Sequence, residues 1–73
     1  MSKTTKETLK TLGKKVQKLR KEKGLTQEDL AHELGISRVY MGYIEQGRES
    51  PSLKLLMKMA RKFNVKVEDL FHK

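Results

Sequence analysis

Apolar residues recur along this chain at intervals of three and four, the spacing of one buried face of an α-helix. The first repeat sets four apolar side chains among lysines, namely Leu9, Leu12, Val16 and Leu19. Gly24 follows this repeat, and a helix is predicted up to that residue because glycine commonly ends helices. Gly13 inside the repeat costs about 1 kcal/mol relative to alanine, which favours a helix start near Leu12.

The pattern is densest in residues 25–47, where it predicts two short helices separated by one glycine. Thr26 and Asp29 have the spacing of a capping box at the start of the first helix, and Ser37 is a favourable N-cap for the second. Gly35 can adopt the left-handed conformation that ends one helix and turns the chain into the next. The apolar positions of this pair are Leu30, Ala31, Leu34, Ile36, Met41 and Ile44. The stretch therefore predicts a helix-turn-helix.

Two further helices are predicted after this motif. Turn-forming residues fill residues 47–52, and a fourth helix follows over residues 52–64. Its expected buried face contains Leu53, Leu56, Met57, Ala60 and Phe63. Leu55 and Met59 lie on a neighbouring strip that the core does not obviously need, and a short fifth helix is predicted over residues 67–71.

No stretch alternates apolar and polar residues as a strand would, so the predicted fold is all-α, a compact five-helix domain over residues 9–73. Residues 1–8 are expected to form a flexible basic leader. A domain of this size typically has a core that supplies only about 3–5 kcal/mol. With no cysteine and two distant histidines, neither a disulfide nor a metal site is expected to support it. We therefore expect subunit association and no cofactor.

Several classes of protein are excluded by what the sequence lacks. No apolar run is long enough to span a bilayer, and the lysine-rich start lacks the apolar segment of a signal peptide, so a cytoplasmic location is expected. No nucleophile-base pair, carboxylate pair or glycine-rich phosphate loop stands out. The sequence therefore indicates no enzyme, no membrane partner and no evident small-molecule effector.

The net charge of +8 indicates an anionic partner, with nucleic acid ahead of membrane. The charge is unevenly placed: residues 1–24 carry +7, residues 25–51 carry −3 and residues 52–73 carry +4. Because the predicted motif is itself acidic, attraction to phosphate must come from the flanks, from Arg38 and Arg48, and from helix N-termini. Each lysine also fits a solvated surface that keeps the protein soluble.

The motif resembles the helix-turn-helix of the Xre/Cro family, which includes lambdoid phage repressors and the controller proteins of restriction-modification systems. Small Ala31, turn-forming Gly35 and the apolar positions between Leu30 and Ile44 carry the resemblance. Further landmarks are Arg20, Gly24, Glu45 to Arg48, Pro51 to Leu53 and Val67 to Phe71. The resemblance covers roughly residues 12–71 and implies a lambda-repressor-like DNA-binding domain.

When a helix-turn-helix binds DNA, its second helix enters the major groove and presents its first residues to base edges. The outward positions are Arg38, Val39, Gly42 and Tyr43. Arg38 is the expected principal base reader, because a guanidinium can bond guanine O6 and N7 together; a phosphate clamp or a solvated arginine is the alternative. Val39 would contact a thymine methyl. Gly42 fits either a close backbone approach or a tolerated helix weakness, and Tyr43 fits a half-buried residue equally well.

The resemblance also implies a set of phosphate contacts. They are expected at Thr26, Gln27, Ser37, Tyr40, Gln46 and Arg48. Gln27 matches the family's phosphate-gripping glutamine at the start of the first motif helix, whereas Tyr40 fits the core as well as a phosphate. Arg20 and Glu45 are expected to pair across the first and third helices as a structural contact.

The expected function is sequence-specific binding of double-stranded DNA by a transcriptional regulator, a repressor or an autoregulatory controller. Two-fold homodimers would read a palindromic operator with half-sites about 34 Å apart. The candidate dimer interface is Leu55, Met59, Val65, Val67, Leu70 and Phe71; these residues would also serve simply to cover the fifth helix. The alternatives are an antitoxin or protein-interaction module of the same fold, and non-specific nucleic-acid compaction.

Overall fold

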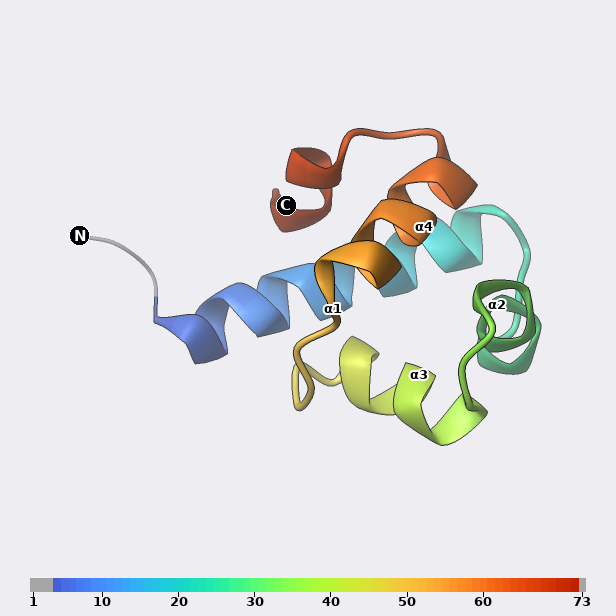
Figure 1. Ribbon diagram of the computed structural model, residues 1–73, viewed down its shortest axis with the longest axis horizontal. Coiled ribbons are helices and arrows are strands. Elements are labelled where there is room, and N and C mark those ends of the chain that lie inside the picture. The colour runs from blue at the N-terminus through green and yellow to red at the C-terminus, as the bar shows by residue number, and fades with distance from the viewer. Residues whose placement is uncertain (1–3, 73) are drawn as a thin grey trace.

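The computed structural model describes residues 4–72, which form four α-helices and one 3₁₀-helix around a single core (Figure 1). In chain order these are α1 (Thr5–Glu22), α2 (Gln27–Leu34), α3 (Arg38–Glu45), α4 (Leu53–Phe63) and the 3₁₀-helix η1 (Val67–Phe71). Residues 4–72 contain no strand, and none of their helices has the length and apolar character needed to cross a membrane. The all-helical class is confirmed, with the predicted fifth helix present as a 3₁₀-helix.

The first helix begins much earlier than its apolar repeat suggested. The Thr4 hydroxyl accepts a bond from the Glu7 backbone N–H at 3.1 Å, and the Glu7 carboxylate accepts one from the Thr4 N–H at 3.1 Å. This capping box stabilises a start at Thr5. A start near Leu12 is therefore wrong, and residues 5–8 of the expected leader are helical; residues 1–3 lie outside the described part of the chain.

Gly13 proves to be a packing requirement, where the sequence suggested a weak point in the helix. It is buried where α1 crosses the end of α3. A Cβ at this position would lie 2.4 Å from the Glu45 carbonyl oxygen and 2.6 Å from that of Ile44. Only glycine allows the two backbones to come this close.

The core draws side chains from every helix. Its buried members are Leu12, Val16, Leu30, Ala31, Leu34, Met41, Ile44, Leu55, Met59, Ala60, Phe63 and Leu70. The apolar positions predicted to be buried in α1, α2 and α3 are thus confirmed, with Leu9 and Leu19 packed against the core from its edge. A shared core of this kind fixes the angles between helices that are each too short to be stable alone.

The predicted buried face of α4 is correct at Ala60 and Phe63 and wrong at its N-terminal half. Leu53 and Met57 are 66% and 47% exposed, whereas Leu55 and Met59 are buried. Apolar residues cover more than half of the circumference of this helix, opposite one strip of basic residues. This apolar arc is wider than the face that the core buries, so the sequence leaves its exact centre undecided. Leu55, Met59 and Leu70 therefore belong to the monomer's core and are not available to a dimer interface.

The remaining members of that expected interface are only partly covered. Val65, Val67 and Phe71 are half-buried and pack against the core. They therefore line the seam between η1 and the rest of the domain, which was the alternative considered for them.

Two lysines of α4 hold the second half of α2. The Lys58 ammonium donates to the Leu34 carbonyl oxygen at 2.9 Å, and Lys62 forms an ion pair with Glu33. Leu34 is the last residue of α2, so Lys58 bonds a carbonyl that has no partner within its own helix. These contacts anchor the segment from which the turn into α3 departs.

Candidate nucleic-acid interface

The turn between α2 and α3 fixes where the exposed helix begins. Gly35 has φ +73°, and the Ile36 N–H donates to the Ala31 carbonyl oxygen at 3.0 Å. Ser37 then caps α3, because its hydroxyl accepts a bond from the Tyr40 N–H at 3.0 Å. Arg38 is consequently the first residue of α3. The predicted helix-turn-helix is present, with the boundaries that its caps indicate.

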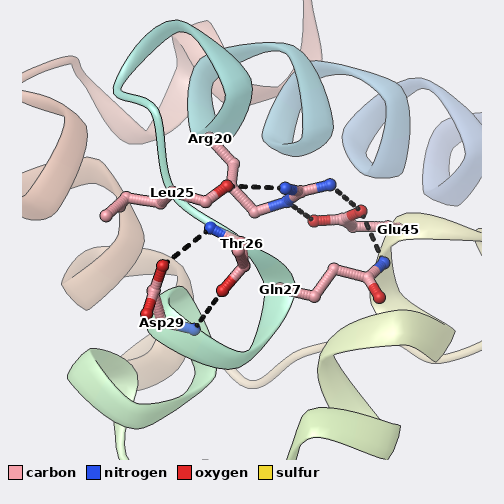
Figure 2. Close-up of polar contacts among 6 residues, drawn as sticks. All are labelled: Arg20, Leu25, Thr26, Gln27, Asp29 and Glu45. Atoms are coloured by element: carbon pink, nitrogen blue, oxygen red, sulfur yellow. Dashed lines mark hydrogen bonds and ion pairs between the residues drawn. The ribbon is translucent and has the colours of Figure 1, made fainter.

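A buried ion pair joins α1 to the last residue of α3 (Figure 2). Arg20 Nε donates to Glu45 Oε2 at 2.6 Å and Arg20 Nη2 to Glu45 Oε1 at 3.2 Å. Arg20 Nη1 also donates to the Leu25 carbonyl oxygen at 2.7 Å. Both side chains are more than nine-tenths buried, so this two-point contact restricts the angle at which α3 leaves α1. It is the pair that the sequence led us to expect.

Gln27 completes this network from the first turn of α2. Its Nε2 donates to Glu45 Oε1 at 2.9 Å, as Figure 2 shows. One amide hydrogen of the expected phosphate ligand is thus bonded to α3, and the amide has a second hydrogen to donate. The end of α3 is therefore bonded to both α1 and α2.

The start of α2 is a complete capping box. The Thr26 hydroxyl accepts from the Asp29 N–H at 3.0 Å, and Asp29 Oδ2 accepts from the Thr26 N–H at 2.9 Å. The backbone and hydroxyl bonds to Thr26 hold the pKa of the Asp29 carboxyl below its ordinary value. Asp29 is therefore a structural residue of this helix start.

The outward face of α3 carries the expected reading residues. Arg38 is exposed, Val39 is 57% exposed and Tyr43 is 36% exposed. Gly42, in contrast, is buried, and a Cβ there would lie 3.2 Å from Arg38 Nη1. The Arg38 side chain thus lies along α3 over Gly42. The open surface expected at Gly42 is absent, because the arginine covers it.

A shallow depression beside Arg38 brings the expected phosphate ligands of α2 close to it. It is lined by Arg20, Thr26, Gln27, Glu28 and Arg38. Sequence reasoning missed Glu28, whose carboxylate introduces negative charge at this spot. Its position one residue after Gln27 on the exposed start of α2 was the available signal.

The remaining expected phosphate ligands are Tyr40 within α3 and two residues of the loop after it. Tyr40 is half-buried and packs against the core. In the loop, the Arg48 guanidinium lies over the Tyr43 ring, 4.4 Å from its centroid, and Arg48 Nη1 is 3.5 Å from Gln46 Oε1. Lys10 of α1 lies beside this loop at Gly47, a neighbour that the sequence did not indicate.

Comparison with known proteins matches the same region. A model of the helix-turn-helix family matches residues 16–70, which is well over half of the chain. A helix-turn-helix-type transcriptional regulator of Methanocaldococcus jannaschii is 57% identical over 47 residues, 64% of this chain and 71% of that protein. Another from Archaeoglobus fulgidus is 42% identical over 57 residues, covering 78% of this chain and 81% of the relative.

A solved structure is similar in fold as well. The restriction-modification controller protein C.AhdI of Aeromonas hydrophila superposes with a TM-score of 0.79 at 36% identity. The match covers 86% of this chain and 96% of that one. The Xre/Cro resemblance seen in the sequence is thereby confirmed.

Proposed function

Because this chain belongs to the helix-turn-helix family of DNA-binding transcription regulators, which are not enzymes, we propose that it recognises a palindromic operator as a homodimer. The exposed start of α3 enters the major groove of each half-site. Occupancy of a promoter then controls transcription, as a repressor or an autoregulatory controller.

The observation that carries this proposal is that Arg38 and Val39 are exposed on a helix whose other face is buried. Both lie at the start of this helix, and its buried face includes Met41 and Ile44. Arg38 has the length and donor geometry to bond guanine O6 and N7, a contact that discriminates by about 1–3 kcal/mol. Val39 offers an apolar surface to a thymine methyl.

Phosphate contacts surround these two readers. Thr26, Gln27 and Ser37 lie at the starts of α2 and α3, where backbone N–H groups favour anions. Gln46, Arg48 and the half-buried Tyr40 supply further donors on either side of α3. For Gln27, the amide hydrogen not bonded to Glu45 is the donor. The Glu28 carboxylate repels phosphate and restricts where the backbone can pass.

Homodimers are proposed because one domain of this size spans few base pairs. Because Leu55 and Met59 are buried in the monomer, the proposed interface on α4 is instead Leu53 and Met57, an exposed apolar pair one turn apart. Half-buried Leu56 lies beside them. Burial of exposed apolar surface drives such association. Half-buried Val65, Val67 and Phe71 remain at its margin.

Selection of bound sequences from a random duplex pool tests operator recognition and its symmetry together. Recovered sites should contain two inverted half-sites with centres about 34 Å apart. The R38A variant should relax base choice at one position per half-site and lose about 1–3 kcal/mol of discrimination there. R61A, at an exposed arginine of α4, is the matched control and should keep the wild-type preference. Unchanged selection by R38A would contradict the proposal.

Light scattering of the free protein and of its DNA complex tests the dimer. Wild-type protein should elute as a dimer at micromolar concentration or on its operator, and the L53K/M57K variant as a monomer. The K54A change, at an exposed neighbour on α4, serves as the control. A wild-type monomer in both conditions would remove the homodimer from the proposal.

A further inference from the structure

At the end of α3, Tyr43, an expected base contact, lies next to Arg48, an expected phosphate contact. Gly47 has φ +76°, its N–H donates to the Ile44 carbonyl oxygen at 3.1 Å, and the Arg48 N–H donates to the Tyr43 carbonyl oxygen at 2.9 Å. This pair of bonds is the Schellman motif, which turns the chain back against the last turn of the helix. Arg48 is thereby brought next to Tyr43.

The side chains continue what the backbone begins. The Arg48 guanidinium carbon lies 4.4 Å from the centroid of the Tyr43 ring, within the range of a cation–π interaction. Arg48 Nη1 also lies 3.5 Å from Gln46 Oε1, a long hydrogen bond on the same side of the loop. The flat face of the guanidinium is used by the ring, while its edge keeps N–H donors for an anion.

The loop is also held from the side of α1. A Cβ at Gly47 would lie 2.9 Å from Lys10 Cγ and 3.0 Å from Lys10 Cα. Gly47 is therefore required twice, for its left-handed backbone and for the close approach of α1. The backbone conformation that brings Arg48 to Tyr43 is thus fixed by contacts within the protein.

We infer that Tyr43 is a positioning residue, whose ring holds Arg48 in place for a phosphate of the DNA backbone beside the end of α3, and that its hydroxyl reads no base. This inference rests on the proposed DNA-binding function. Preorganisation is its physical advantage, because a long arginine side chain otherwise loses rotamer freedom when it binds. Lys10, beside the same loop, adds positive charge to this position.

The free protein tests the stack without DNA. Ring currents should shift the Arg48 side-chain proton resonances upfield in the wild-type protein and in Y43F, which keeps the aromatic ring. The shift should disappear in Y43L. Identical Arg48 resonances in Y43F and Y43L would overturn the inference, because the ring would then not hold the guanidinium.

Operator binding measured against salt concentration tests the phosphate contact. Each phosphate contact adds about 0.9 to the steepness with which log K falls as log[salt] rises. The proposed homodimer loses one contact per subunit, so the steepness should fall by about 1.8, which is about 12-fold in affinity between 50 and 200 mM salt. We expect this fall for R48Q and a similar one for Y43L, with no further fall in the double variant. Y43F should bind like the wild-type protein and keep its base preference.

Other results of these binding measurements distinguish failure of the positioning role from failure of the proposed DNA-binding function. A lost preference at one base pair in Y43F, or full additivity of Y43L and R48Q, would overturn the positioning role while leaving DNA binding intact. Wild-type protein without operator binding would refute the proposed function, and the phosphate role with it. K66Q, at an exposed lysine just before η1, is the control for non-specific charge loss.

Discussion

The two ends of α3 have opposite surroundings. At its last residue, Glu45 is buried and bonded to Arg20 of α1 and Gln27 of α2. At its first residues, Arg38 and Val39 are exposed. A helix of eight residues is too short to be stable by itself. The buried end therefore sets the direction in which the exposed end projects, and damage to each end should have a different consequence.

The largest loss of stability is expected from a change at Gly13, where α1 contacts the buried end of α3. G13A places a Cβ 2.4 Å from the Glu45 carbonyl oxygen, and a backbone atom cannot move away cheaply. We expect a loss of about 5 kcal/mol, which is as much as the whole core of so small a domain supplies. Circular dichroism should show an unfolded or partly folded chain. K14A, at the next and exposed position of α1, should remain folded; equal stability of the two variants would refute the close approach.

The buried ion pair should come next. E45Q leaves the Arg20 guanidinium buried without its carboxylate, and we expect a loss of about 3 kcal/mol in urea denaturation. R38A changes the other end of the same helix and is the matched control. It should change stability by less than about 0.5 kcal/mol while altering base choice. Similar destabilisation by both variants would erase the contrast between the two ends.

The turn before α3 is expected to depend on one lysine. K58M keeps most of the apolar stem but removes the bond to the Leu34 carbonyl oxygen, so we expect a loss of about 1 kcal/mol. Amide hydrogen exchange at Gly35 and Ile36 should accelerate in this variant. K54M, one turn earlier on α4 and exposed, should exchange like the wild-type protein; equal acceleration in both would refute a specific role for Lys58.

The smallest expected effect is on the pH dependence of stability, through the Asp29 carboxylate. The pKa of Asp29 is lowered in the folded state by its bonds to Thr26. A lowered folded-state pKa means that the carboxylate stabilises the fold above its ordinary pKa, and that this contribution is lost as the pH falls below about 4. D29N should therefore show a flatter dependence of melting temperature on pH between about 7 and 3. E28Q, at the neighbouring exposed carboxylate, provides the reference slope, and a D29N slope equal to that of the wild-type protein would contradict the role of the cap.

Much of the candidate site could be predicted because its signals are local. Thr26 and Gly35 determine where α2 begins and ends, and Ser37 determines where α3 begins, through bonds within three to five residues of themselves. Residues placed by such local caps, such as Arg38, can be assigned to a surface from the sequence. The relation of Gly42 to Arg38 was not predicted, because it depends on the rotamer that a long side chain adopts.

The helical class, the helix-turn-helix and the buried positions of α1, α2 and α3 follow from the sequence alone, because hydrophobic period and capping residues act over a single turn. Which side of α4 is buried depends on its packing against the other helices, since apolar residues at Leu53, Leu55, Met57 and Met59 offer more than one inward face. The contact of Gly13 with the end of α3 likewise appears only in the folded molecule. Both outcomes depend on backbone distances between segments that are far apart in the chain, and no local pattern encodes those distances.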